Sequence, residues 1–115
     1  MLNIKKIEID FLNECAEDYV GLWSLIKLAK NYFHTILDLK LKRIILDLIY
    51  RNLIDEQIEA GEIPKDKEFQ FLKWDMSPED IIKRIEKEWD KLEKEPDLGD
   101  VVWFTLRNPI DSSKE

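Results

Sequence analysis

The chain has 115 residues, of which 44% are hydrophobic and 37% are charged, and its formal net charge is -7. This length is sufficient for one domain with its own hydrophobic core, and the composition excludes a disordered or a membrane-spanning chain. The negative charge disfavours non-specific nucleic-acid binding, which depends on clustered lysine and arginine side chains. We therefore expect a single domain over residues 1–115, with its core at about 14–106 and a frayed tail at 107–115.

The N-terminal residues and the cysteine content indicate a compartment. No apolar run reaches the roughly 18 residues of a membrane span, and Glu8 and Asp10 interrupt the segment where a signal peptide has its apolar region. Cys15 is the single cysteine, so no internal disulfide can form, which fits a reducing compartment. These features predict a cytoplasmic protein that does not associate with a membrane.

Apolar spacing in the first third of the chain predicts one long helix, preceded by a segment with two interpretations. Ile7, Ile9 and Phe11 alternate with acidic residues, which is typical of a strand, although a helical start also fits. Residues 14–33 carry apolar side chains three and four positions apart, which predicts a helix with one broad apolar face. Gly21 would cost up to about 1 kcal/mol inside such a helix, and it would permit the close approach of another backbone.

A second helix is predicted over residues 38–54, with Asp38 as its N-cap. Its unbroken apolar stripe places it at the centre of the core. Residues 58–60 and 69–74 then alternate apolar and polar side chains on either side of a polar stretch at 61–67. This arrangement predicts a β-hairpin with a polar tip.

The third predicted helix has the clearest start. Ser77 fits the N-cap and Pro78 the first helical position. Pro96 ends the helix, Gly99 makes a turn, and residues 101–106 form a strand. The fold is therefore expected to be α+β and mostly helical, with three helices and a small antiparallel hairpin or sheet, in a winged-helix-like order.

No motif for catalysis, cofactor binding or metal binding is present. His34 is the only histidine and lies a helix length from Cys15 along the chain, so neither has the positioned partner that nucleophilic catalysis needs. A structural zinc site needs more cysteine and histidine ligands, and a phosphate-binding loop needs glycines that lie closer together. Carboxylate pairs such as Glu86 and Asp90 are common on any charged helix. We expect no catalytic residue, no cofactor, no metal and no enzymatic activity.

Negative charge is concentrated after the second predicted helix. Residues 55–63 have a net charge of -4, which comes from Asp55, Glu56, Glu59 and Glu62. Their spacing does not match a calcium-binding loop. One interpretation is that they are partner-binding residues that attract a basic protein. The plainer interpretation is a solvated acidic edge.

Basic residues in and before the second predicted helix suggest an alternative. They are Lys27, Lys30, Lys40, Lys42, Arg43 and Arg51. If this helix were a recognition helix, they could contact phosphates, and the chain would be a winged-helix-like DNA-contacting regulator. The wide apolar stripe and the acidic flanks argue against it, so a nucleic acid is the less favoured partner.

The tryptophans at the predicted strand ends, Trp74 and Trp103, belong either to the core or to an interface. Aromatic motifs also carry a resemblance. They are Tyr19-Val20-Gly21-Leu22-Trp23, and Glu88-Trp89, Leu92, Glu95-Pro96, Leu98-Gly99-Asp100 and Val102-Trp103-Phe104. On these motifs the chain from about Asp18 to Phe104 resembles a family of short uncharacterised bacterial proteins, which implies a shared fold and no particular activity.

A second resemblance concerns the build of the chain rather than a motif. In size, acidity and lack of catalytic groups it is similar to the immunity partners of contact-dependent or polymorphic toxins. This resemblance implies a non-enzymatic protein that binds a basic toxin domain and neutralises it by occlusion.

Overall fold

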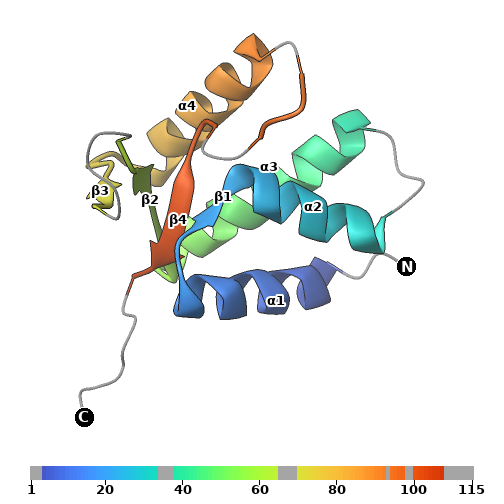
Figure 1. The fold of residues 1–115 in the computed structure, drawn as a ribbon, viewed down its shortest axis with the longest axis horizontal. Helices are drawn as coiled ribbons and strands as arrows, with labels where there is room; N and C mark the ends of the chain where they lie inside the picture. The colour runs from blue at the N-terminus through green and yellow to red at the C-terminus, as the bar shows by residue number, and fades with distance from the viewer. Residues whose placement is uncertain (1–3, 34–37, 65–69, 93, 98–99, 108–115) are drawn as a thin grey trace.

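The computed structural model describes residues 4–33, 38–64, 70–92, 94–97 and 100–107. In chain order its elements are α1 (Ile4–Glu17), β1 (Val20–Gly21), α2 (Leu22–Tyr32), α3 (Asp38–Ile54), β2 (Ile58–Glu62), β3 (Leu72–Lys73), α4 (Pro78–Lys91) and β4 (Trp103–Leu106). These elements make a mostly helical α+β fold with one small antiparallel sheet (Figure 1), and they confirm the predicted fold class. Among the described residues there are four helices, because the first predicted helix is divided.

The segment before residue 14 is helical, so the strand interpretation of this segment is wrong. Ile7, Phe11 and Cys15 are buried at intervals of four residues on one side of α1, and Ile9 on the opposite side is 48% exposed. The apolar alternation over residues 7–11 is therefore part of a helical period. The core also begins earlier than residue 14, since Ile7 and Phe11 belong to it.

The predicted helix over residues 14–33 is interrupted by a strand. α1 ends at Glu17, and the Asp18 carboxylate accepts a hydrogen bond from the Tyr19 backbone N–H at 2.7 Å. Gly21 then ends β1 in an extended conformation and is the N-cap of α2. The apolar residues on both sides of this break face the same core, which explains the continuous apolar periodicity of the sequence.

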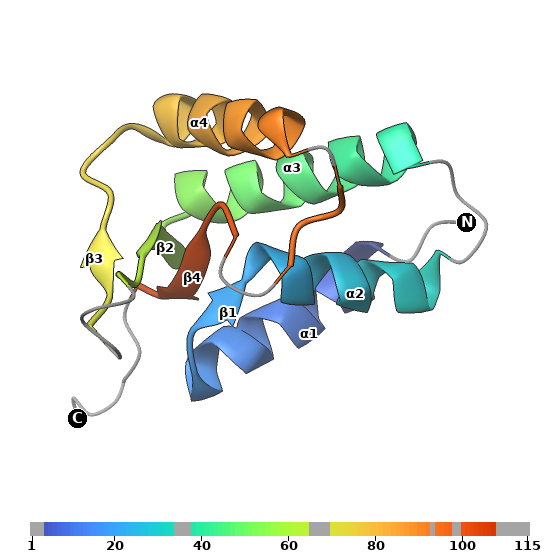
Figure 2. The ribbon, with the colours of Figure 1, turned by 45° about the horizontal axis from the view of Figure 1, so that its top comes forward.

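α3 confirms the second predicted helix, although Asp38 is its first helical residue and not its N-cap, and it lies at the centre of the molecule. It packs against α4 on one side and against α2 and β2 on the other, and Figure 2 shows α4 running alongside it. Its buried apolar residues are Leu41, Ile45, Leu46, Leu48, Ile49 and Leu53. One polar residue, Asn52, is buried with them, and its amide donates hydrogen bonds to the Leu48 carbonyl at 2.9 Å and to the Glu8 carboxylate at 2.8 Å.

The predicted hairpin and the start of α4 are both confirmed. β2 pairs with β3 in antiparallel register, with Gly61 opposite Lys73, whereas Phe69 and residues 65–67 of the predicted polar tip lie outside the described residues. The Ser77 hydroxyl accepts a hydrogen bond from the Asp80 N–H at 3.1 Å, as an N-cap does, and Pro78 is the first helical residue. α4 ends at Lys91, before Pro96.

The last strand lies inside the sheet rather than at its edge. The strand order is β1-β4-β2-β3, and Phe104 of β4 stands between Val20 of β1 and Ala60 of β2. The β2–β3 hairpin is therefore not a free wing, because β4 pairs with β2 along its length. Beyond β4, the Arg107 N–H donates to the Gln57 carbonyl at 2.9 Å, and the rest of the predicted tail lies outside the described residues.

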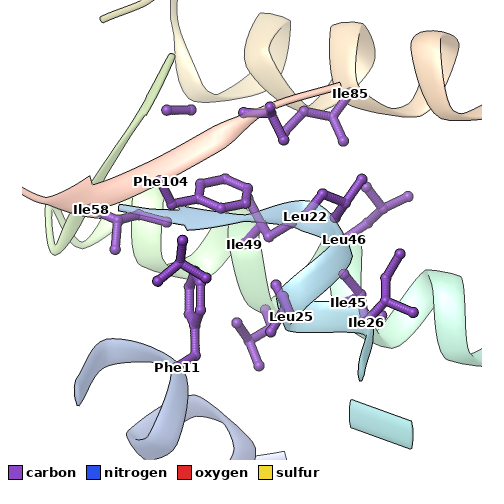
Figure 3. Packing of buried hydrophobic residues seen from close by; sticks show 14 of the residues in the cluster. Phe11, Leu22, Leu25, Ile26, Ile45, Leu46, Ile49, Ile58, Ile85 and Phe104 are labelled. Carbon is purple, nitrogen blue, oxygen red and sulfur yellow. The ribbon is translucent and has the colours of Figure 1, made fainter. Parts of the chain in front are cut away.

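The core fills the space between the sheet and the helices (Figure 3). Phe104 from β4 and Phe11 from α1 meet edge to face, with ring centroids 5.5 Å apart and an interplanar angle of 85°. Trp74 is 6% exposed and belongs to the core, whereas Trp103 is half-buried outside it. The two tryptophans that the sequence left open thus have different environments.

Candidate functional site

The four carboxylates predicted to bind a partner do not form one cluster. Asp55 and Glu56 are exposed in the turn that follows α3. Glu59 and Glu62 lie three positions apart on β2, and the pleat of a strand sends side chains at this spacing to opposite faces of the sheet. The structure therefore brings Glu59 towards the turn and separates Glu62 from it.

Glu62 interacts with residues on the α4 side of the sheet. Its carboxylate accepts a hydrogen bond from the Trp74 indole N–H at 3.2 Å and lies 3.4 Å from the Arg84 guanidinium. That guanidinium is stacked over the Trp74 ring, 3.9 Å from the centroid, and pairs with Glu88 at 3.0 Å. Glu62 thus stabilises the packing of α4, which makes it the weakest of the four as a contact for a partner.

An open groove of about 200 Å³ lies between the end of α3, β2 and the connection from β3 to α4. Glu56 and Glu59 line it together with Asp75. Two apolar side chains also line it, Ile54 and Met76, which are 47% and 37% exposed. Exposed apolar side chains that share a groove with a polar rim are typical of a protein-binding surface. Exposed apolar residues that are scattered singly over a surface carry no such meaning.

The negative charge of the groove is only partly balanced. The Lys73 ammonium lies 3.8 Å from the Glu59 carboxylate, and Arg107 is a second cation at the groove. Neither Glu56 nor Asp75 forms an ion pair with any residue that the structure describes. The groove therefore combines apolar area with carboxylates that are available to a basic partner.

A carboxylate at the start of α4 adds to this charge. Glu79 follows Pro78, which also lines the groove, and accepts a hydrogen bond from the Tyr50 hydroxyl at 2.8 Å. Hydrogen bonding to the backbone at the helix start, and then the bond from Tyr50, lower the pKa of Glu79. The same bond to Glu79 raises the pKa of Tyr50. At neutral pH Glu79 is ionised and Tyr50 is a neutral donor.

The turn that presents Asp55 and Glu56 is a Schellman motif at the end of α3. The Gln57 N–H donates to the Asn52 carbonyl at 2.9 Å, and the Glu56 N–H donates to the Leu53 carbonyl at 3.1 Å. Glu56 has a φ angle of 59°, in the left-handed region that glycine favours at this position. A glutamate here carries backbone strain that a glycine would not carry.

Glu56→Gly is expected to raise the free energy of unfolding by about 0.5–1 kcal/mol. Relief of the left-handed strain contributes about 1–2 kcal/mol, and the greater freedom of glycine in the unfolded chain offsets about 0.4–1 kcal/mol of it. Urea unfolding followed by far-UV circular dichroism measures the difference. Glu56→Gln is the control, because it removes the charge and keeps the strain, so it should not stabilise the fold. A destabilised Glu56→Gly variant would contradict the motif.

Other chemistry-bearing residues do not gather into a site. Cys15 is buried in the core, and burial raises the pKa of its thiol to about 12, so it is an unreactive thiol at neutral pH. His34 lies outside the described residues. Within the described ranges no three His, Cys, Asp or Glu side chains are grouped so that they could hold a metal ion. None of the described helices has the length and apolar content needed to span a membrane.

The basic residues of the alternative DNA-contacting interpretation are divided by the fold. The side chain of Lys42 pairs with Asp90 of α4, and the side chain of Lys30 pairs with Glu95. Lys40, Arg43 and Arg51 stay exposed on α3, where Asp47 lies on the same exposed side. Both flanks of α3 are covered by other elements. This arrangement offers a nucleic acid fewer free cations than the sequence suggests.

Sequence reasoning missed three of the residues that line the groove. Ile54 lies in the second predicted helix, where the sequence gives it no role, and Asp75 and Met76 lie in a connection that carries no motif. These residues meet only because β3 returns the chain to β2 and α4 then packs on α3. Comparisons with protein-family models, with curated proteins and with solved structures find no match for this chain.

Proposed function

We propose that this protein is an acidic, non-enzymatic protein-binding protein, and specifically an immunity protein that neutralises a basic bacterial toxin domain by occlusion. The observation that supports the proposal is the groove, where Ile54 and Met76 are exposed beside the carboxylates of Glu56 and Asp75. The strain at Glu56 supports it further, since backbone strain is concentrated at functional sites.

The groove would act in two steps. The net charge of -7 and the carboxylates around the groove attract a basic surface and raise the rate of encounter. Ile54 and Met76 then lose water against apolar side chains of the partner, which slows dissociation. Occlusion needs no catalytic group in the immunity protein, because the bound protein covers the active surface of the toxin.

The triple variant Asp55→Asn/Glu56→Gln/Asp75→Asn is expected to bind the toxin with an association rate about 10-fold lower at low salt, because steering charge is lost. The protein encoded immediately upstream of this gene is the first partner to test. Calorimetric titration gives the affinity of the wild-type complex, and stopped-flow mixing gives the association rates.

The matched control is Glu14→Gln/Glu17→Gln/Asp47→Asn, which removes the same charge from exposed positions on α1 and α3. It should slow association less than the groove variant does. Equal slowing by both variants would show that net charge alone acts and that the groove is not the binding site. A salt-dependent shift of duplex DNA, without binding to the upstream protein, would instead favour the DNA-contacting alternative.

A further inference from the structure

The sheet has an aromatic face on the side away from its buried row. Residues that stand directly opposite each other on neighbouring strands project to the same face. Gly21 of β1, Trp103 of β4, Gly61 of β2 and Lys73 of β3 form one such row across all four strands. The adjacent row contains Phe104, which is buried against α1. In Figure 1, α3 lies behind the sheet, and β1 and β4 are seen with no described helix in front of them.

Two tryptophan rings lie over the β1 end of this row. A Cβ atom on Gly21 would be 3.3 Å from Cε3 of Trp23 and 3.6 Å from Cζ3 of Trp103, so both indoles lie next to the same glycine. Both side chains are half-buried. Neither tryptophan belongs to the core that the described residues form or packs against it.

Two further rings lie near Gly61, the β2 residue of this row. A Cβ atom on Gly61 would be 2.8 Å from Cζ of Phe71, so the Phe71 ring lies over this glycine. Tyr19 stacks on Phe71 with a centroid distance of 5.3 Å and an interplanar angle of 8°. We define Tyr19, Trp23, Phe71 and Trp103 as the aromatic face. Four half-buried rings on one side of a sheet, outside the core, form a surface suited to stacking.

The other two tryptophans show what these rings can accept. Trp74 has the Arg84 guanidinium 3.9 Å from its ring centroid, and Trp89 has the Lys42 ammonium at 5.1 Å. Among the residues described, no cation lies over either tryptophan of the aromatic face. The chain thus places its own cations over Trp74 and Trp89, and none of the cations in its described part lies over Trp23 or Trp103.

A carboxylate lies on the same side of the sheet as these two indoles. Glu59 is two positions from Gly61 on β2 and opposite Thr105 on β4, so it is a diagonal neighbour of Trp103. Such neighbours are roughly 7–8 Å apart, within reach of long side chains. The ion pair of Glu59 with Lys73 is long at 3.8 Å, and the Lys73 side chain is 48% exposed, so the pair is weak. A cation that binds the Glu59 carboxylate more tightly can therefore replace Lys73.

We propose that the aromatic face binds an arginine side chain of the protein partner, whose guanidinium stacks on Trp103 or Trp23 and pairs with Glu59. This inference rests on the proposed function as a protein-binding protein and assigns the chemistry of one contact. Arginine fits better than lysine, because its planar group stacks on an indole and forms two hydrogen bonds to a carboxylate at once. The charge of -7 disfavours both a nucleic acid and a second copy of this chain.

The test uses an acetylated tetra-arginine peptide and a tetra-lysine peptide of equal charge as probes. Tryptophan indole N–H signals in the ¹⁵N NMR spectrum are assigned with single Trp→Phe variants. Tetra-arginine should shift the signals of Trp23 and Trp103 in a saturable way and leave those of Trp74 and Trp89 in place. Tetra-lysine should bind at least about threefold more weakly than tetra-arginine.

Two variants and one control establish the contact. Trp103→Leu should reduce the saturable shift of the Trp23 signal, and Glu59→Gln should weaken tetra-arginine binding at least about threefold. Glu86→Gln removes the same charge from α4 and should leave the binding unchanged. The Glu59 side chain is 24% exposed and lies outside the core, so its variant gives a result even if Trp103→Leu fails to fold.

Several outcomes would overturn the assignment. Equal shifts of all four indole signals by both peptides would show non-specific attraction. Signal shifts on dilution of the protein alone would assign the face to a second copy, and tighter binding of a single-stranded oligonucleotide would assign it to nucleic acid. If the upstream protein binds Glu59→Gln and Trp103→Leu as tightly as wild type, the inference fails and the proposed function stands. If tetra-arginine binds as expected and the upstream protein does not bind, the proposed function fails and the arginine site stands.

Discussion

Replacing Phe104 by alanine is expected to lower the free energy of unfolding by about 3–5 kcal/mol. The Phe104 side chain is fully buried at the centre of the sheet, and its strand pairs with β1 and β2 at once. Its removal leaves a cavity next to Phe11, whose ring meets it edge to face. Because small domains have a total stability of about 5–15 kcal/mol, the loss should be visible as a large fall in the urea midpoint.

The control for this prediction is Thr105→Ala, on the same strand and half-buried on the opposite side of the sheet. It should cost less than about 1 kcal/mol. A double-mutant cycle with Phe11→Ala should give a coupling of about 0.5–1.5 kcal/mol, the range for aromatic pairs. If Phe104→Ala lost no more unfolding free energy than Thr105→Ala, the side of β4 that carries Phe104 would not face the core.

Gly61→Ala is the second variant with a large expected effect, a loss of about 2–4 kcal/mol. The added Cβ would collide with the Leu72 carbonyl oxygen and would lie 2.8 Å from Cζ of Phe71. The first of these atoms belongs to the backbone of β3, so it cannot move without opening the β2–β3 pairing. Urea unfolding measures the loss, and hydrogen exchange of the β3 amides reports local opening.

Gly21→Ala is the matched control, since Gly21 stands in the same row of the sheet. The three atoms nearest to its added Cβ would be tryptophan ring atoms, the first at 3.3 Å, and side chains can shift where a backbone cannot. We expect a cost below about 1 kcal/mol. If the two glycine variants were equally stable, the close approach of β3 to Gly61 would be contradicted.

The groove and the aromatic face border on the same two residues. Glu59 and Lys73 line the groove and also belong to the sheet side that carries Trp103. A partner that binds the carboxylates at the end of α3 could therefore place an arginine on the aromatic face in the same complex. Of the predicted acidic set, Glu59 is therefore the residue that lies at both the groove and the aromatic face.

The sequence by itself determined the elements whose signals are local. α3 is set by its apolar stripe, and the start of α4 is set by Ser77 and Pro78, whose capping and backbone preferences act within one helical turn. The alternation before and after the polar stretch likewise set the hairpin of β2 and β3. Net charge and the lack of catalytic motifs are also properties of the chain alone.

Only the tertiary structure decided how distant segments share the sheet and the core. Periodicity over residues 7–11 fits a strand and a helix equally, and the helix forms because Ile7, Phe11 and Cys15 can then be buried on one side. The sequence also cannot show that Trp74 is buried while Trp103 is half-exposed. That difference depends on β4 entering between β1 and β2, which is a pairing between residues far apart in the chain. Such pairings, and the groove they create, follow from the packing of the whole domain, because no local preference distinguishes one face of a strand from the other.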